Sequence, residues 1–164
     1  MKRISHKALL CLVHYDPETG QWARLSNKQG IGWKRERVGY VMPTGYLRIK
    51  LGNKRYLGHV LAWFYMTGKW PKHIVDHKDN DKTNLCWDNL RKATWIENRV
   101  NSKCRRDNKT GFKGVHQQSP GVYVALLRTK KKNITLGRFD CPRKANAAYL
   151  AAAKKLYGAF ARAS

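Results

Sequence analysis

Short apolar runs alternate with turn-forming residues along the first seventy positions of the chain. Residues 12–25 hold two such runs around the turn sequence of residues 16–20, which is typical of a β-hairpin. Residues 26–38 are polar and basic and show no periodicity. In residues 45–51 apolar and basic positions alternate, which predicts a strand with one face in a core and the other charged. Residues 59–67, closed by a glycine, have the length and apolar density of a short buried helix.

The last third of the chain predicts three strands followed by a helix. The strands are expected in residues 111–116, 122–128 and 133–139, which are separated by turn residues. Pro142 suits the first turn of the helix and Gly158 suits its end. The apolar stripe expected on this helix consists of Ala145, Ala148, Tyr149, Ala152 and Leu156. So many alanines would let the helix lie close against a sheet.

The charge balance limits the partners that this protein can have. The 164 residues include 34 Lys and Arg against 10 Asp and Glu, a formal net charge of +24. Such a charge favours a polyanion, whose counterions are released when basic side chains approach. The chain also carries 18 aromatic residues and is 42% hydrophobic, so it can form a core and is not a basic tail. A nucleic acid is therefore the expected partner.

Cysteine spacing and apolar content indicate the compartment. The four cysteines are scattered and form no C-x-x-C pair, so the sequence supports neither a zinc knuckle nor a disulfide framework. The longest apolar run near the N-terminus, residues 8–13, is too short for a signal-peptide core or a membrane span. We expect a soluble, cytoplasmic protein with no membrane partner.

The middle of the chain carries the candidate chemistry. We expect a strand over residues 74–78, a wide loop over 79–89, a return strand over 90–94 and a helix over 95–102. Five of the ten acidic residues lie within the 22 positions from Asp76 to Glu97, namely Asp76, Asp79, Asp81, Asp88 and Glu97. Carboxylates weaken phosphate binding, so their position in a basic chain calls for a reason. One possible reason is purely structural, namely that Asp76 pairs with a nearby arginine.

This strand, strand and helix order resembles the HNH endonuclease family, with its ββα-metal site. The motif letters fall here on His77, Asn89 and Asn98. Asparagine at the third position is similar to the variant of phage and intron-encoded homing endonucleases. The resemblance implies that Asp76 and Asn98 hold one divalent metal ion, Mg²⁺ or else Mn²⁺, and that Asn89 organises the loop without touching the metal.

A histidine and a metal ion suit phosphodiester hydrolysis for physical reasons. The reaction needs a water made nucleophilic and a leaving oxygen whose charge is stabilised. An imidazole with a pKa near roughly 6.5 can accept the proton at cellular pH. Side chains of neighbouring strand residues point to opposite faces, so Asp76 and His77 can take separate roles without occupying the same place.

Other residues near the motif have weaker claims on function. Arg91 and Arg99 are candidate phosphate clamps, with a solvated surface position as the alternative. Glu97 is either an accessory metal ligand or, as we prefer, a solvated helix residue. His59 lies four residues before Trp63 on the expected helix and should pack against it.

Residues 111–164 resemble the plant ethylene-response-factor DNA-binding domain, a three-stranded sheet backed by a helix. Gly114-Val115, Arg128, residues 136–139 and the run Ala147-Ala148-Tyr149 carry the resemblance. It places the DNA contacts on Lys113, His116, Gln118, Arg128 and Thr135. Three of these differ from the arginines and tryptophan usual in the family, so its base preferences do not carry over.

The turn after the second of these strands holds three successive lysines. Lys130, Lys131 and Lys132 suit phosphate contacts better than base contacts, and a solvated loop is an equal alternative. We count Lys130 among the expected DNA-binding residues.

Together these observations predict an α+β protein. A strand-rich region over residues 1–71 leads into the HNH unit of residues 72–102, then a basic linker over 103–110 and the three-stranded sheet and helix of 111–164. The expected function is a sequence-tolerant, homing-type DNA endonuclease of phage or mobile-element origin. It would act as a monomer on double-stranded DNA and need no small-molecule cofactor.

Two other functions fit parts of the pattern. The first is a non-catalytic DNA-binding protein that keeps the HNH unit as a scaffold, although the motif residues are all present. The second is RNA binding, which the charge alone permits. A sheet that reads a major groove favours duplex DNA, because duplex RNA hides its major groove from side chains.

Overall fold

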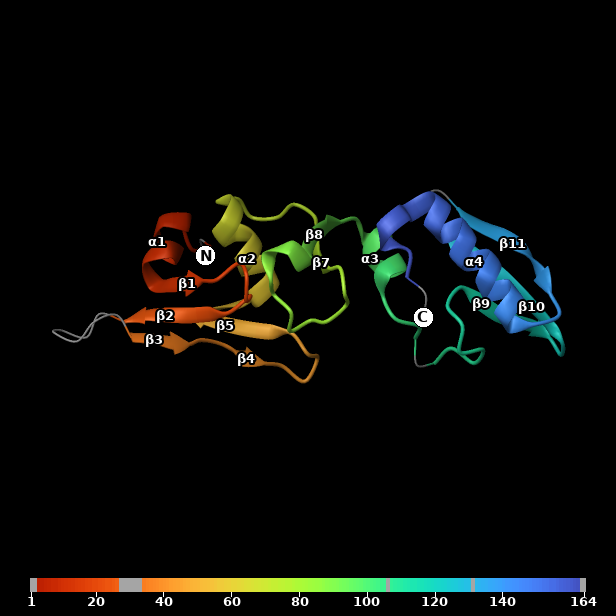
Figure 1. The fold of residues 1–164 in the computed structure, drawn as a ribbon, viewed down its shortest axis with the longest axis horizontal. Helices are drawn as coiled ribbons and strands as arrows, with labels where there is room; N and C mark the ends of the chain where they lie inside the picture. Colours follow the sequence, from red (N-terminus) through yellow and green to blue (C-terminus); the bar gives the residue numbers. More distant parts are fainter. Residues whose placement is uncertain (1–2, 27–33, 106, 131, 163–164) are drawn as a thin grey trace. The chain divides into compact units, whose positions relative to one another are not determined.

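The computed structural model describes residues 3–26, 34–105, 107–130 and 132–162. It is a mixed α/β fold of small sheets and helices, arranged as two compact units, residues 1–92 and 93–164 (Figure 1). Lys131 and most of the polar stretch 26–38 lie outside the described residues. No helix in the described ranges is long and apolar enough to cross a membrane.

The first unit holds three small antiparallel sheets and two helices. Its elements are α1 (His6–Leu12), β1 (Val13–Tyr15), β2 (Trp22–Ser26), β3 (Lys34–Arg37), β4 (Tyr40–Val41), β5 (Leu47–Leu51), β6 (Lys54–Leu57), α2 (Gly58–Thr67), β7 (Ile74–His77) and β8 (Leu90–Ala93). The sheets have the orders β1-β2-β3, β4-β5-β6 and β7-β8. The expected hairpin, strand and buried helix are present as β1-β2, β5 and α2. Helix α1 and strands β3 and β4 were not anticipated.

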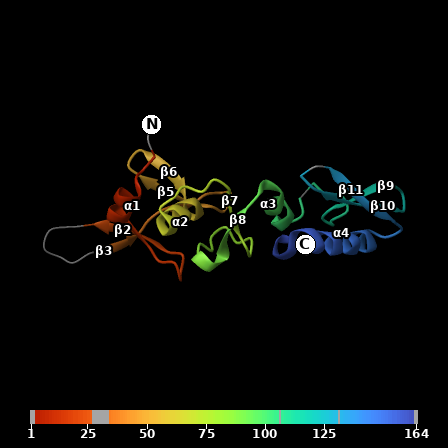
Figure 2. The same ribbon diagram turned by 90° about the horizontal axis from the view of Figure 1, so that it is seen from above.

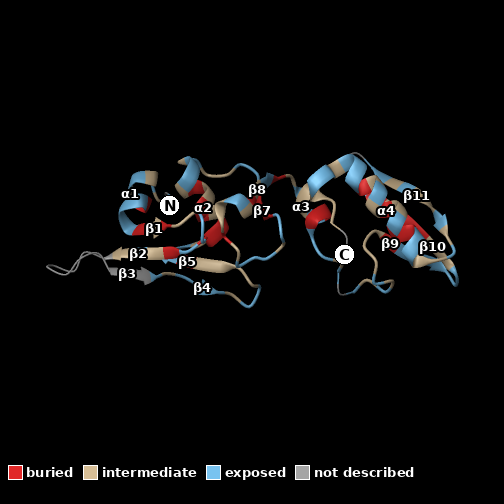
Figure 3. Cartoon of the chain, viewed as in Figure 1, coloured by how far each residue is buried: buried red, intermediate tan, exposed pale blue. Residues whose placement is uncertain are grey.

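The core of the first unit reaches into the loop between β7 and β8. Leu9, Tyr15, Ile49 and Leu85 are almost completely buried (Figure 3). The hydroxyl of Tyr15 donates a hydrogen bond to the backbone carbonyl of Leu85 at 2.5 Å. The long loop that follows β7 is therefore anchored in the core near its middle.

The second unit is a three-stranded antiparallel sheet with a helix on one face. Its elements are α3 (Trp95–Asn101), β9 (Val115–Ser119), β10 (Val122–Arg128), β11 (Asn133–Phe139) and α4 (Pro142–Tyr157). The strand order is β11-β10-β9, and α4 packs on the sheet (Figure 2). The core between them is made by Val115, Ala125, Leu127, Ala145, Tyr149 and Ala153. The first strand begins at Val115 and not at Gly111, because residues 111–114 form a bend.

The buried face of α4 differs from the predicted stripe. The helix buries Ala145, Asn146, Tyr149 and Ala153, whereas Leu156 is 53% exposed. The side-chain amide of Asn146 donates a hydrogen bond to the carbonyl of Lys113 at 3.0 Å. Ala145 and Tyr149 of the predicted stripe are buried, but the prediction of Leu156 as a member of that stripe was wrong.

The absence of a side chain at Gly114 lets the ring of Tyr149 on α4 pack closely against the backbone. A Cβ at this position would lie 2.1 Å from the ring of Tyr149, and the backbone has a φ of +73°. We expect Gly114→Ala to destabilise the second unit by the left-handed backbone cost of about 1–2 kcal/mol plus an overpacking cost of about 1–3 kcal/mol. Gly111→Ala is the matched control, because its φ is +70° and nothing lies within 4 Å of its Cβ position. Chemical denaturation should show the larger loss for Gly114→Ala, and equal losses would contradict this packing.

Candidate functional site

Strand β7 buries the two ionisable side chains of the motif. Asp76 and His77 are each 5% exposed. The carboxylate of Asp76 accepts a hydrogen bond from Nε of Arg91 on β8 at 3.0 Å, an ion pair that is itself largely buried. The pairing that the sequence left open for Asp76 is therefore present. Arg91, expected as a candidate phosphate clamp, holds this carboxylate instead of standing on the surface.

His77 lies in a cluster of rings from three separate segments. Its ring centroid is 4.9 Å from that of His59 on α2 and 6.2 Å from that of Tyr46, which precedes β5. His59 and Tyr46 are also in contact, with centroids 5.2 Å apart. His59 is buried, as expected of a core residue, and the ring of Trp63, its expected neighbour, lies 5.1 Å from that of Trp87.

Burial keeps both histidines of this cluster in the neutral form. It lowers the pKa of His59 to about 3, with the neighbouring His77 acting in the same direction. Burial also lowers the pKa of His77, while the charges of Asp76 and Asp79 oppose the shift. Within the described residues, the buried Nδ1 of His59 has no hydrogen-bond partner, which also favours a neutral ring. His77 is thus an imidazole that can accept a proton at neutral pH.

Asn89 closes the loop that separates β7 from β8. Its side-chain oxygen accepts a hydrogen bond from the backbone N–H of Asp79 at 3.1 Å. Its amide group donates to the Asp79 carboxylate and to the carbonyl of Asn84, both at 2.9 Å. Its backbone carbonyl accepts from the N–H of Lys78 at 2.9 Å. These bonds fix the chain directly after His77.

The acidic residues of this loop form local turns. The Asp79 carboxylate accepts from the backbone N–H of Asp81 at 2.8 Å, and the Asp81 carboxylate accepts from that of Thr83 at 2.9 Å. Both are the short-range bonds by which aspartate stabilises a turn.

Helix α3 of the second unit carries Asn98 and Arg99. Thr94 and Glu97 form a capping box at its start, in which the Glu97 carboxylate accepts from the N–H of Thr94 at 2.7 Å. Glu97 is thus a capping residue of α3, a role that was not predicted for it from the sequence. Asn98 is half-buried, and the exposed Arg99 lies over the ring of Trp95 with its guanidinium carbon 5.4 Å from the centroid.

The motif residues include oxygen donors of the kind that a hard cation takes. Asp76 in the first unit has a carboxylate and Asn98 in the second an amide oxygen, and Mg²⁺ accepts both kinds of ligand while it keeps several waters. A carboxylate has about four acceptor sites, so its bond to Arg91 is compatible with a further cation. Across the described ranges, no group of three or more His, Cys, Asp and Glu forms a metal cluster.

Four of the expected DNA contacts in the second unit share the solvent face of the sheet. Val115, Ala125 and Leu127 point into the core, so the residues that alternate with them point away from α4. His116, Gln118, Arg128 and Thr135 are all exposed and occupy those positions. Lys130 is exposed in the turn that follows β10.

Lys113 is placed differently from the other four. Its ammonium group donates hydrogen bonds to the carbonyls of Val100 and Ser102, at the C-terminal end of α3. Burial lowers the pKa of Lys113 to about 8. The side chain thus satisfies the end of a helix, a role that sequence alone could not separate from a DNA contact.

Comparison with known proteins supports the motif. Residues 56–100 match the model of a family described as HNH endonuclease, from β6 into α3. The match supports an HNH domain in this part of the chain, and with it a nuclease or DNA-binding function. No curated protein and no solved structure matches the chain. The matched segment ends before the second sheet, so the resemblance of residues 111–164 to the ethylene-response-factor domain stays a prediction.

The role of Asn89 predicts a local effect of its removal. Asn89→Ala leaves the backbone N–H of Asp79 and the carbonyl of Asn84 without these partners, which should cost roughly 1–3 kcal/mol of local stability. Amide hydrogen exchange in residues 79–88 should become faster. Asn53→Ala, at an exposed turn position, is the control and should leave this exchange unchanged. Identical exchange in the two variants would show that the Asn89 side chain does not hold the loop.

Proposed function

We propose that this protein is a metal-dependent DNA endonuclease whose active site is built on Asp76, His77, Asn89 and Asn98. The observation that carries the proposal is the neutral, buried His77 beside the Asp76 carboxylate, within the segment that matches the HNH family. A base and an oxygen ligand on adjacent residues are what hydrolysis of a phosphodiester requires.

His77 serves as the general base in this proposal. Its imidazole accepts a proton from the attacking water, which a neutral ring can do at cellular pH. The rings of His59 and Tyr46 fix its orientation, and the bonds of Asn89 fix the backbone that follows it. Asn89 and His59 are thus positioning residues and do not touch the substrate.

Asp76 and Asn98 would hold a divalent ion, Mg²⁺ or Mn²⁺, in this proposal. When bound, such an ion would stabilise the negative charge on the leaving oxygen. Arg91 fixes the Asp76 carboxylate on β7 through the ion pair at 3.0 Å.

The rest of the chain holds the substrate. The net charge of +24 and the exposed face of the second sheet favour double-stranded DNA. By resemblance the enzyme is of the homing type and of phage or mobile-element origin, with recognition that tolerates mismatches. It carries one motif per chain, so a monomer would nick one strand.

A second candidate function is a non-catalytic DNA-binding protein. The ion pair between Asp76 and Arg91 favours it, because a carboxylate held by an arginine can be purely structural. The two functions differ in whether His77 has a kinetic role.

Substitution of single histidines tests this difference. We expect His77→Ala to slow cleavage of a labelled DNA duplex by about 10²–10⁴-fold, the usual contribution of a general base. His73→Ala, at an exposed loop position four residues earlier, should cleave at the wild-type rate. Affinity for DNA measured in chelator should be the same for both variants. Cleavage that survives His77→Ala would remove the proposed base.

The role of Asn98 makes a separate prediction about metal. Asn98→Ala should raise the Mn²⁺ concentration for half-maximal cleavage by at least about tenfold, the smallest effect usual for a residue that supports a metal. Asn98→Asp, which retains an oxygen ligand, should stay closer to the wild type. A metal titration of cleavage rate measures both, and identical midpoints for all three proteins would contradict ligation by residue 98.

A further inference from the structure

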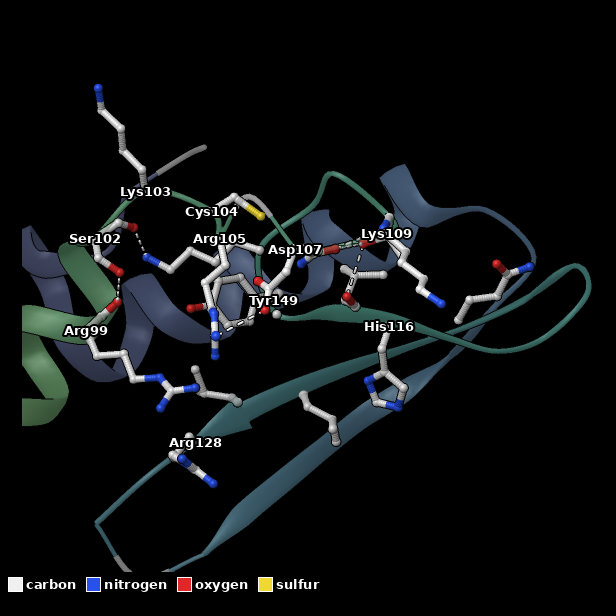
Figure 4. Close-up of a pocket in the computed structure, with 18 of the residues that line it drawn as sticks. Arg99, Ser102, Lys103, Cys104, Arg105, Asp107, Lys109, His116, Arg128 and Tyr149 are labelled. Carbon is white, nitrogen blue, oxygen red and sulfur yellow. Dashed lines mark hydrogen bonds and ion pairs between the residues drawn. The ribbon is translucent and has the colours of Figure 1, made fainter.

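The second unit contains a hollow whose lining includes none of the motif residues Asp76, His77, Asn89 and Asn98. It has a volume of about 810 Å³ and is bounded by the end of α3, the segment after it, strand β9 and the end of β10 (Figure 4). Such a volume lies within the range typical of ligand sites. The hollow opens along β9, an edge strand of the sheet.

The segment that forms one wall is folded, although its sequence suggested a linker. The side chain of Asn108 donates to the carbonyl of Phe112 at 2.9 Å and accepts from the backbone N–H of Thr110 at 2.9 Å. The hydroxyl of Thr110 donates to the carbonyl of Val115 on β9 at 3.1 Å. Lys113 ties the same wall to the end of α3. The described residues from 103 to 110 therefore form a structured part of the second unit.

Three arginines from three segments line the hollow. Arg99 comes from α3, Arg105 from the segment after it and Arg128 from the end of β10, and Figure 4 shows all three among the lining residues. Arg99 is held over the Trp95 ring, and Nε of Arg128 donates to the side-chain oxygen of Asn133 at 3.1 Å. Both guanidinium groups are thus oriented by neutral partners that leave their charge uncompensated.

The charge of the hollow is strongly positive. Its lining includes Arg99, Lys103, Arg105, Lys109, Lys113 and Arg128. Asp107 is the one carboxylate among the described lining residues, and it pairs with Arg105 at 3.0 Å. That pair is 77% and 67% exposed, so solvent screens it and an incoming anion can compete for the arginine. A concave surface of one sign concentrates the field and attracts anions of the opposite sign.

We propose that Arg99, Arg105 and Arg128 form a phosphate-binding hollow that grips the backbone of duplex DNA beside the sheet. The inference rests on the proposed function, because it takes DNA as the partner of this chain. Guanidinium groups suit the task, since each can donate two parallel hydrogen bonds to one phosphate. Lys103, Arg105 and Lys109 then belong to the DNA-binding surface, and Arg99 acts with the second sheet.

The salt dependence of DNA binding tests the proposal without any cleavage. The full chain is titrated in chelator with a fluorescein-labelled DNA duplex at several salt concentrations. The variant combines Arg99→Gln, Arg105→Gln and Arg128→Gln. The control combines Arg143→Gln, Lys154→Gln and Lys155→Gln, three exposed positions on α4 outside the hollow, and removes the same charge.

The hollow variant should lose about 0.9 in the slope of log affinity against log salt for each phosphate contact removed, up to about 2.7 for three contacts. The slope of the control should fall by less than the value of about 0.9 that one phosphate contact contributes. Replacing the same three arginines by lysine should restore most of the slope, which separates lost charge from a misfolded unit. Circular dichroism checks that every variant is folded.

Equal slopes for the hollow variant and its control would overturn the inference and leave the proposed nuclease untouched. An effect of the arginines on an RNA duplex alone would also overturn it. If the hollow variant loses slope as expected but the wild type cuts no DNA with Mg²⁺ or Mn²⁺, the proposed nuclease fails and the hollow remains supported.

Discussion

Burial of Asp76 and His77 side by side on the four-residue strand β7 is the constraint on which the rest of the site depends. A buried charge is costly unless it is paired, and the Arg91 guanidinium at 3.0 Å meets this requirement for Asp76. His77 meets it by staying neutral among the rings of His59 and Tyr46. Asp76 is thus held by an ion pair and His77 by ring contacts, on adjacent residues of one strand.

A strand pair as short as β7-β8 needs support from outside itself. Asn89 fixes the connecting loop through its bonds to Asp79 and Asn84, and Leu85 anchors the middle of that loop in the core under Tyr15. Asp79 and Asp81 accept hydrogen bonds within this loop, which gives these two carboxylates a structural role in a basic chain.

The sequence predicted the order of the elements and many of their ends. The hairpin at residues 12–25, the helix closed by Gly68, and the strand, strand and helix around the motif follow from turn residues and periodicity, which act locally. Helix α1 was missed because its seven residues carry no clear period, although Ser5 caps it by accepting from the N–H of Ala8 at 3.3 Å. The burial of Asn146 on α4 was missed because its partner, the carbonyl of Lys113, lies 33 positions away in the sequence.

The candidate site residues show the same difference between local sequence signals and contacts made by distant segments. A motif can point to His77, but the contact of His59 and Tyr46 with its ring is made by segments far apart in the chain. Likewise Arg91, Lys113 and Glu97 could be named as charged residues near a motif. Whether each meets a carboxylate, a helix end or its own N-cap depends on tertiary structure. Spacing within a sequence does not contain that information.

The central claim is that this chain hydrolyses DNA, and the most direct measurement is the conversion of supercoiled DNA by the purified protein. With Mg²⁺ or Mn²⁺ the account predicts nicked product, and with chelator it predicts none. Tight binding to the same DNA without cut product in either metal would contradict the account and leave a DNA-binding protein.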